Sequence, residues 1–218
     1  MKMDLSQLEF GSLLTYCPRG TAKNTEHSRN VMQALKRDQH VGEPPILMSE
    51  WIARMIKQKM AELPFTDFFQ PNTILVPVPK SSLMQPNSLW VPERIATAFV
   101  SVGIGKQVVS CLIRSEAVPK AALSSPSERP TAKRHYDTIT VQDILCKPEE
   151  ILLVDDVVTR GAIFMGCANR LTDAFPDCRI RAFAAMRTIS NPNDFQNVYL
   201  PCNGFIDLWE TGDTYRRP

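Results

Sequence analysis

Two adjacent carboxylates, Asp155 and Asp156, follow an apolar run at residues 151–154 and precede a small turn at residues 159–162. Carboxylates accept hydrogen bonds from sugar hydroxyls and bind Mg²⁺. A turn whose free backbone N–H groups open a helix is suited to binding phosphate. The spacing therefore predicts a site for a 5-phosphoribosyl group. The alternative is a buried strand whose acids only cap the next helix, although one acid is enough for a cap.

The residues around the acid pair predict a strand followed by a helix. Four consecutive apolar residues at 151–154 are typical of a buried parallel strand. After the turn, apolar residues recur at helical spacing, at Phe164, Cys167, Ala168, Leu171 and Phe175. Ligands bind at the carboxyl ends of strands in parallel α/β sheets, so the acids and the turn fall where a ligand is expected.

Apolar strands and amphipathic helices alternate along the remaining chain. We expect strands at residues 73–79, 107–113 and 179–190, and helices near residues 31–37, 49–62 and 92–103. This alternation predicts an α/β protein with a Rossmann-like parallel sheet flanked by helices. We divide the chain into an N-terminal helical appendage or hood at 1–64, a core at 65–190 and a C-terminal tail at 191–218 that packs on the core.

A second group of polar residues follows the strand at 73–79. The strand ends in Pro77-Val78-Pro79, and Lys80, Ser81 and Ser82 come directly after it. A lysine beside hydroxyl groups can bind a diphosphate and its Mg²⁺. The alternative is an edge strand ended by prolines, with a solvated lysine.

The polar segment 114–139 is basic and is interrupted by three prolines. Long segments of this kind in compact domains are often functional lids, or are disordered. A lid can exclude water and bring cations to a departing anion, and Arg129 and Lys133 are our candidates for this role. The alternative is a solvated basic loop.

Residues 151–162 resemble the phosphoribosyl-pyrophosphate (PRPP) signature of the type I phosphoribosyltransferases. That signature has four hydrophobic residues, two acids, two hydrophobic residues and a turn rich in Thr and Gly. The Pro-Val-Pro strand end at 77–79, Leu112-Ile113-Arg114 and Ala34-Leu35-Lys36 also resemble the ComF-type members. The resemblance implies the type I phosphoribosyltransferase fold with a hood, and Mg²⁺-dependent transfer from PRPP.

The resemblance also implies roles for individual residues. Asp155 and Asp156 would bind the ribose hydroxyls and Mg²⁺, and Arg129 and Lys133 would act from the lid. The remaining PRPP-binding residues would be Val158, Thr159, Arg160, Gly161 and Ala162 at the 5-phosphate, and Lys80, Ser81 and Ser82 at the diphosphate. Lys80 is counted among the catalytic residues together with the two acids.

The sequence departs from these families in four places. Ile163 stands where the signature usually ends in Thr or Ser, the zinc-binding cysteines of ComF-type proteins are absent, and residues 84–90 replace that family's usual Arg and Gly-Phe-Asn-Gln segment. Thr159 stands where relatives acting on 6-oxopurines carry an acid, and a threonine cannot act there as a general acid or base. The sequence therefore does not identify the acceptor, but it disfavours a 6-oxopurine.

Composition and charge pattern indicate which partners and which cell compartment to expect. The chain has 25 Lys and Arg and 23 Asp and Glu residues, for a net charge of +2, so charge does not indicate a nucleic-acid partner, although a local patch stays open. It has no apolar run long enough for a bilayer and no signal-peptide pattern, and its six cysteines form no Cys-x-x-Cys pair. We expect a cytoplasmic protein with reduced thiols, without a membrane partner.

The expected ligands are PRPP with Mg²⁺ and a small-molecule acceptor. The sequence is compatible with a homodimer and with a larger complex. Two other functions remain. One is a non-catalytic module that binds PRPP or a nucleotide for regulation. The other is an effector subunit of a defence or toxin assembly that carries a phosphoribosyltransferase-like domain. Fold alone does not choose among them.

Overall fold

The computed structural model of the chain describes residues 3–119, 128–144 and 147–218. Its centre is a seven-stranded sheet in the order β11 (Thr214–Arg217), β10 (Tyr199–Leu208), β1 (Gln7–Tyr16), β9 (Arg179–Thr188), β8 (Glu150–Val158), β4 (Ile74–Pro77) and β5 (Gln107–Val108). The strands from β1 to β5 in this order are parallel, whereas β10 is antiparallel to β1 and β11 is antiparallel to β10. The predicted α/β class with a mostly parallel sheet is confirmed.

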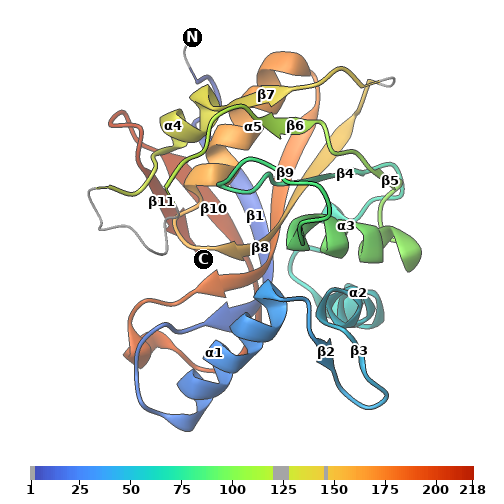
Figure 1. Ribbon diagram of the computed structural model, residues 1–218, viewed down its shortest axis with the longest axis vertical. Helices are drawn as coiled ribbons and strands as arrows, with labels where there is room; N and C mark the ends of the chain where they lie inside the picture. Colours follow the sequence, from blue (N-terminus) through green and yellow to red (C-terminus); the bar gives the residue numbers. More distant parts are fainter. Residues whose placement is uncertain (1–2, 120–127, 145–146) are drawn as a thin grey trace.

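Helices cover both faces of the sheet. The described helices are α1 (Lys23–Lys36), α2 (Met48–Lys59), α3 (Val91–Ser101), α4 (Ala132–Asp137) and α5 (Ala162–Ala174), with short 3-10 turns at Met60–Glu62, Thr66–Phe68 and Pro192–Asp194. Two small hairpins accompany them: β2 (His40–Val41) pairs with β3 (Ile46–Leu47), and β6 (Leu112–Arg114) pairs with β7 (Ile139–Val141). Figure 1 shows α4 and α5 at the top with β6 and β7, and α1 and α2 at the bottom with β2 and β3.

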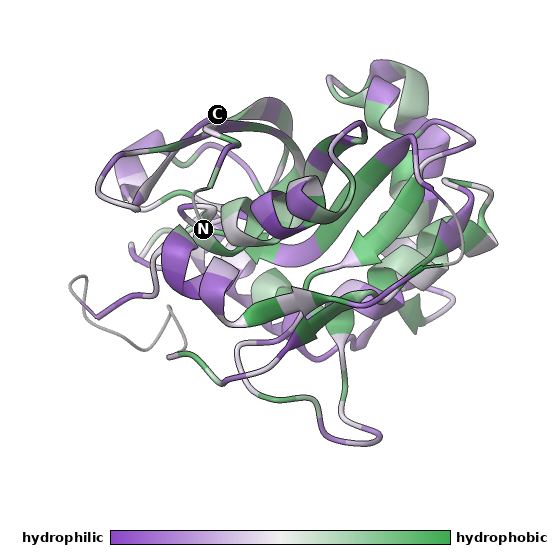
Figure 2. Ribbon diagram, turned by 90° about the horizontal axis from the view of Figure 1, so that it is seen from above, coloured by the Kyte–Doolittle hydropathy of each residue, from purple (hydrophilic) through white to green (hydrophobic). Residues whose placement is uncertain are grey.

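Each face of the sheet has its own apolar core. On one face, residues of α1, α2 and α3, such as Leu35, Ile52 and Phe99, pack with Val154 and Phe183 of the sheet. On the other face, the apolar side of α5 packs against the alternate residues of β8 and β9. The central strands are hydrophobic along most of their length (Figure 2), as expected for parallel strands covered on both faces.

The strand β1 was not predicted from the sequence, because a helical appendage was expected in this part of the chain. β1 lies inside the sheet, between β9 and β10. Its centre contains Gly11, a residue that weakens a strand by local propensity. A β-carbon at Gly11 would come within 2.7 Å of the Phe65 ring, so the glycine is needed for close packing and the strand is fixed by neighbours on both sides.

Three other segments differ from the sequence-based expectation. The tail at 191–218 contains the two strands β10 and β11, although Pro201 and Gly204 argue locally against a strand. The expected strand at 107–113 is divided between β5 and β6, which belong to different sheets. The polar segment at 114–139 is not one long loop, because it contains α4, whose first turn is capped by Thr131 accepting a hydrogen bond from the backbone N–H of Arg134. Residues 120–127 of the expected lid lie outside the described residues.

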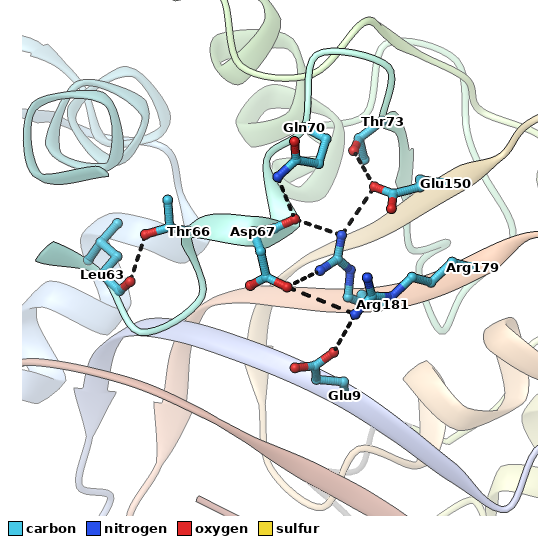
Figure 3. Close-up of polar contacts among 9 residues, drawn as sticks. All are labelled: Glu9, Leu63, Thr66, Asp67, Gln70, Thr73, Glu150, Arg179 and Arg181. Atoms are coloured by element: carbon cyan, nitrogen blue, oxygen red, sulfur yellow. Dashed lines mark hydrogen bonds and ion pairs between the residues drawn. The ribbon is translucent and has the colours of Figure 1, made fainter. Parts of the chain in front are cut away.

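A buried arginine fixes the amino ends of β8 and β9, opposite the carboxyl edge of the sheet (Figure 3). The side chain of Arg181 is 3% exposed and donates to Asp67 Oδ2 at 2.6 Å and to Glu150 Oε2 at 3.1 Å. Arg179 adds longer ion pairs to Glu9 and Asp67. This network stabilises the sheet away from the predicted site. Among the described residues, no helix is long and apolar enough to cross a membrane.

Candidate functional site

The acid pair lies at the carboxyl end of β8, near the middle of the sheet. Asp155 and Asp156 are each 8% exposed. The backbone N–H of Asp156 donates to Asp155 Oδ1 at 2.8 Å, and that of Val157 donates to Asp156 Oδ1 at 2.7 Å. These two hydrogen bonds hold both carboxylates against their own backbone, so the acids are positioned before any ligand binds.

The two acids differ in their electrostatic surroundings. Burial, and after it the neighbouring charge of Asp156, raises the pKa of Asp155 well above its usual value, although Lys36 opposes this shift. Burial by itself lowers the pKa of Lys36, but the carboxylates of Asp156 and Asp155 outweigh burial, so the pKa of Lys36 is raised. The site therefore couples two acids to one cation.

Lys36 contacts the acid pair, and the sequence did not reveal this contact. It is the last residue of α1, and its Nζ lies 2.8 Å from Asp156 Oδ1 and 2.8 Å from Asp156 Oδ2. A lysine in the last turn of a helix is favoured by the helix dipole, so its presence there carries no functional signal. Only the position of α1 over the end of β8 shows which carboxylate Lys36 contacts.

The turn after the acids leads into α5 as predicted. Gly161 is the N-terminal cap of α5 and has a φ of +86°, which side-chain-bearing residues rarely adopt. A β-carbon on Gly161 would also come within 2.5 Å of Ile206 Cδ1. The turn thus lies against β10, and the backbone N–H groups of the first turn of α5 are at the carboxyl edge of the sheet, where they can receive an anion.

The C-terminal strand β11 and the residue before it support this turn. Arg216 Nε donates to the carbonyl oxygen of Thr159 at 2.8 Å, and Arg216 Nη2 donates to that of Thr188 at 2.7 Å. The Arg160 side chain binds both carboxylate oxygens of Asp213, at 2.8 and 2.9 Å. Arg160 can therefore contribute to a phosphate site through its backbone, while its charge is neutralised by Asp213. No local pattern predicts these supports, because they join residues between 28 and 57 positions apart.

Lys80 lies at the same edge of the sheet as the acids. β4 pairs with β8, and the backbone N–H of Val78 donates to the carbonyl oxygen of Val154 at 2.9 Å, so the proline turn runs beside the acid pair. Lys80 Nζ donates to Ser88 Oγ at 2.8 Å. Ser81 is half-buried and Ser82 is exposed. The structure thus brings both predicted polar groups to one edge.

Arg114, the first residue of the expected lid segment, is buried behind the proline turn. Its side chain donates to the carbonyl oxygen of Lys80, to Thr138 Oγ1 at 2.8 Å and toward His135 Nδ1 at 3.3 Å. Burial lowers the pKa of Arg114. Burial, with the charge of Arg114 as a second cause, lowers the pKa of His135 to about 3. Arg114 therefore holds the turn that carries Lys80.

The two lid candidates are not brought to the acid pair by any described contact. Lys133 lies on α4 and binds both carboxylate oxygens of Asp137, at 2.5 and 2.6 Å. α4 itself packs closely against α5, where a β-carbon on Gly166 would come within 2.6 Å of His135. Arg129 is half-buried just before α4. A catalytic role for these two residues remains a prediction.

As they stand, Asp155 and Asp156 do not present a metal site. Both oxygens of Asp156 contact the Lys36 ammonium, and burial favours the protonated form of Asp155. Within residues 3–119, 128–144 and 147–218, no group of three or more His, Cys, Asp or Glu side chains could hold a metal ion. The predicted direct coordination of Mg²⁺ by the two acids therefore does not fit the side chains in this arrangement.

No protein-family model and no curated protein matches the sequence. Among solved structures, two crystal forms of a hypoxanthine phosphoribosyltransferase from Staphylococcus aureus are similar to the chain. The tetragonal form is 10% identical with a TM-score of 0.34, covering 69% of this chain and 70% of the other. The orthorhombic form is 12% identical with a TM-score of 0.33, covering 76% and 78%. At such TM-scores nothing about this chain follows from the similarity.

Proposed function

We propose that the protein is a phosphoribosyltransferase that uses PRPP, with its Mg²⁺, as donor. One observation carries this proposal. The PRPP-like signature at residues 151–162 lies at the carboxyl end of the central strand β8, with its acids held by backbone N–H groups and its turn opening α5. A strand end of this kind is where parallel α/β sheets bind ligands.

The geometry supports a division of roles within the site. Asp155 and Asp156 would accept hydrogen bonds from the ribose hydroxyls. The backbone of residues 158–162, with the hydroxyl of Thr159, would bind the 5-phosphate at the start of α5. Lys80, Ser81 and Ser82 would contact the diphosphate from the end of β4, and Arg114 would hold that turn in place.

Catalysis in this proposal consists of positioning and electrostatic stabilisation. The bond from ribose C1 to the diphosphate breaks, and a bond from C1 to the acceptor forms, without a covalent bond to the protein. Lys80 would stabilise the charge that develops on the diphosphate. Lys80, Ser81 and Ser82 would hold the diphosphate, where Mg²⁺ would supply further neutralisation of charge, since Asp156 is already paired with Lys36.

We propose an acceptor other than a 6-oxopurine. Thr159 stands at the position where relatives with that acceptor carry an acid, and its Oγ1 lies 3.3 Å from Thr188 Oγ1. Two hydroxyls at this place can donate or accept hydrogen bonds, but they do not titrate near neutral pH.

The experiment that tests this function is the release of diphosphate from Mg²⁺–PRPP by the purified chain, alone and with a panel of nitrogenous bases. Release that depends on one base identifies a transferase and its acceptor. A second candidate is a module that binds PRPP or a nucleotide without turnover, favoured by Ile163, which removes a hydroxyl from the first turn of α5. Tight binding of PRPP without release of diphosphate under any condition would favour this second candidate.

A further inference from the structure

The contact between Lys36 and Asp156 joins two very different environments. The Asp156 residue is 8% exposed, whereas the Lys36 side chain is 49% exposed. The ammonium lies 2.8 Å from each carboxylate oxygen and donates a hydrogen bond to Oδ1. An ion pair between two exposed residues contributes little to stability, but here removing the lysine would leave a buried carboxylate without its cation.

Counting donors and acceptors shows what this pair can still bind. A carboxylate has about four acceptor positions, of which Asp156 uses two on Oδ1, one for the backbone N–H of Val157 and one for Lys36. An ammonium has three N–H groups, of which Lys36 uses one for the hydrogen bond to Asp156 Oδ1. At least one acceptor position on Oδ2 and one N–H group of Lys36 therefore remain side by side. This combination suits a hydroxyl group, which donates one hydrogen bond and accepts another.

The same count bears on divalent cations. Mg²⁺ binds oxygen at about 2.0–2.1 Å and requires near-octahedral geometry. An ammonium within 2.8 Å of both oxygens of Asp156 occupies the positions from which a metal would approach. A metal bound directly to Asp156 would therefore have to displace Lys36, and Lys36 would repel it at short range.

We propose that Lys36 is the resident cation of the acid pair, so that Asp156 and Lys36 together bind a hydroxyl of the sugar and no divalent cation binds the acids directly. The identity of the ligand as a ribose phosphate rests on the proposed function. The exclusion of a metal by Lys36 does not rest on it.

The first test measures metal binding without any sugar, using Mn²⁺ and the electron paramagnetic resonance signal of the free ion. The wild-type chain should leave Mn²⁺ free, whereas Lys36→Met should bind it, because the substitution exposes a carboxylate pair without its cation. Arg37→Met is the matched control, since it removes a neighbouring exposed charge from the same helix end and should behave as the wild type. Equal Mn²⁺ binding by the wild type and Lys36→Met, or no binding by either, would overturn the proposal.

The second test measures the affinity for ribose 5-phosphate by calorimetry in the presence of EDTA. The wild type should bind without metal, and Lys36→Met should bind roughly tenfold more weakly, the loss expected for one charge-assisted hydrogen bond. Lys36→Arg, which keeps a cation at this position, should recover most of the affinity. An unchanged affinity in Lys36→Met would remove the sugar-binding part of the proposal.

The two tests separate this inference from the proposed function. If neither the wild type nor any variant binds ribose 5-phosphate or PRPP, the proposed function is wrong. The Mn²⁺ measurement would still decide whether Lys36 excludes a metal from the acid pair.

Discussion

Gly161 and Ile206 are in such close contact that a β-carbon at position 161 would lie 2.5 Å from Ile206 Cδ1. This contact sets the turn between β8 and α5 against β10. The φ of +86° at Gly161 adds a second, independent reason for glycine. The two reasons can be separated experimentally, because only the first depends on Ile206.

Gly161→Ala should therefore distort the turn and weaken ribose 5-phosphate binding. The left-handed backbone alone costs a residue with a side chain roughly 1–2 kcal/mol, and the steric clash adds to this cost. Gly161→Ala combined with Ile206→Ala relieves the clash but retains the backbone strain, so it should recover binding only in part. Calorimetry and unfolding in denaturant measure the two effects. Wild-type binding by the single variant would show that the turn is not part of the site.

Asp155→Asn combined with Asp156→Asn should abolish PRPP binding and leave the fold intact. The acids lie at a strand end, and the amide oxygens can still accept the backbone hydrogen bonds that hold the side chains. PRPP affinity is measured by calorimetry, and folding is measured by circular dichroism. The matched control is Asp207→Asn, which changes an acid on β10 that is paired with Arg217 of β11. This variant should bind PRPP as the wild type does. An unchanged affinity in the double variant would refute the assignment of the site.

Lys80→Ala should weaken PRPP much more than ribose 5-phosphate, because the two ligands differ by the diphosphate that Lys80 is proposed to bind. A charge-assisted contact contributes roughly 1.5–3 kcal/mol, or about ten- to a hundredfold in affinity. Lys147→Ala removes a surface lysine paired with Asp177 and should change neither affinity. If the wild type binds both ligands equally and Lys80→Ala changes neither, the binding-module function replaces the transferase.

Arg181→Met should destabilise the protein without changing ligand affinity. The substitution removes the hydrogen bonds from Arg181 to Asp67 and Glu150 at the amino-end side of the sheet, opposite the site (Figure 3). Asp67 keeps its longer ion pair with Arg179, and Glu150 keeps its hydrogen bond from Thr73. The loss of two hydrogen bonds to charged groups predicts about 2–4 kcal/mol of lost unfolding free energy. Denaturant unfolding measures this loss, and calorimetry on the folded variant measures PRPP binding. A large fall in affinity would mean that the network controls the site from a distance.

His135 should make the stability of the protein depend on pH. Its pKa is lowered to about 3 in the fold by burial and by Arg114, against an ordinary value of 6.5. The unfolded chain therefore binds a proton that the folded chain does not. This contribution to stability is fully present above pH 6.5 and is lost as the pH falls toward 3, by up to roughly 1.4 kcal/mol per pH unit.

The measurement compares unfolding free energies of the wild type and His135→Asn from pH 7 down to the acid limit of folding. The asparagine can still accept the hydrogen bond from Arg114, but it does not titrate. The variant should lose less stability on acidification than the wild type. Parallel curves would show that the pKa of His135 is the same in the folded and the unfolded chain.

Much of the fold around the acids was determined by local sequence. The apolar run of β8, the acids at its end and the apolar spacing of α5 are all contained within 25 consecutive residues, and the structure confirms each element. The strand β4 and the helix α3 were likewise predicted, because prolines at 77 and 79 and at 92 mark their ends and a glycine follows α3. Hydrophobic period and backbone restrictions act over a few residues, so they can be read from the chain.

The position of β1 and the contacts of the site were decided only by tertiary structure. β1 contains a glycine, so its propensity is weak, and its place between β9 and β10 depends on pairing with strands more than 160 residues away. Lys36 and Asp156 are 120 positions apart in the sequence, and Arg216 and Thr159 are 57 positions apart. Each of these contacts forms because the sheet order brings the strand ends to one edge. No local pattern encodes that order, so the sequence predicted the acid pair and the turn but not the residues that complete them.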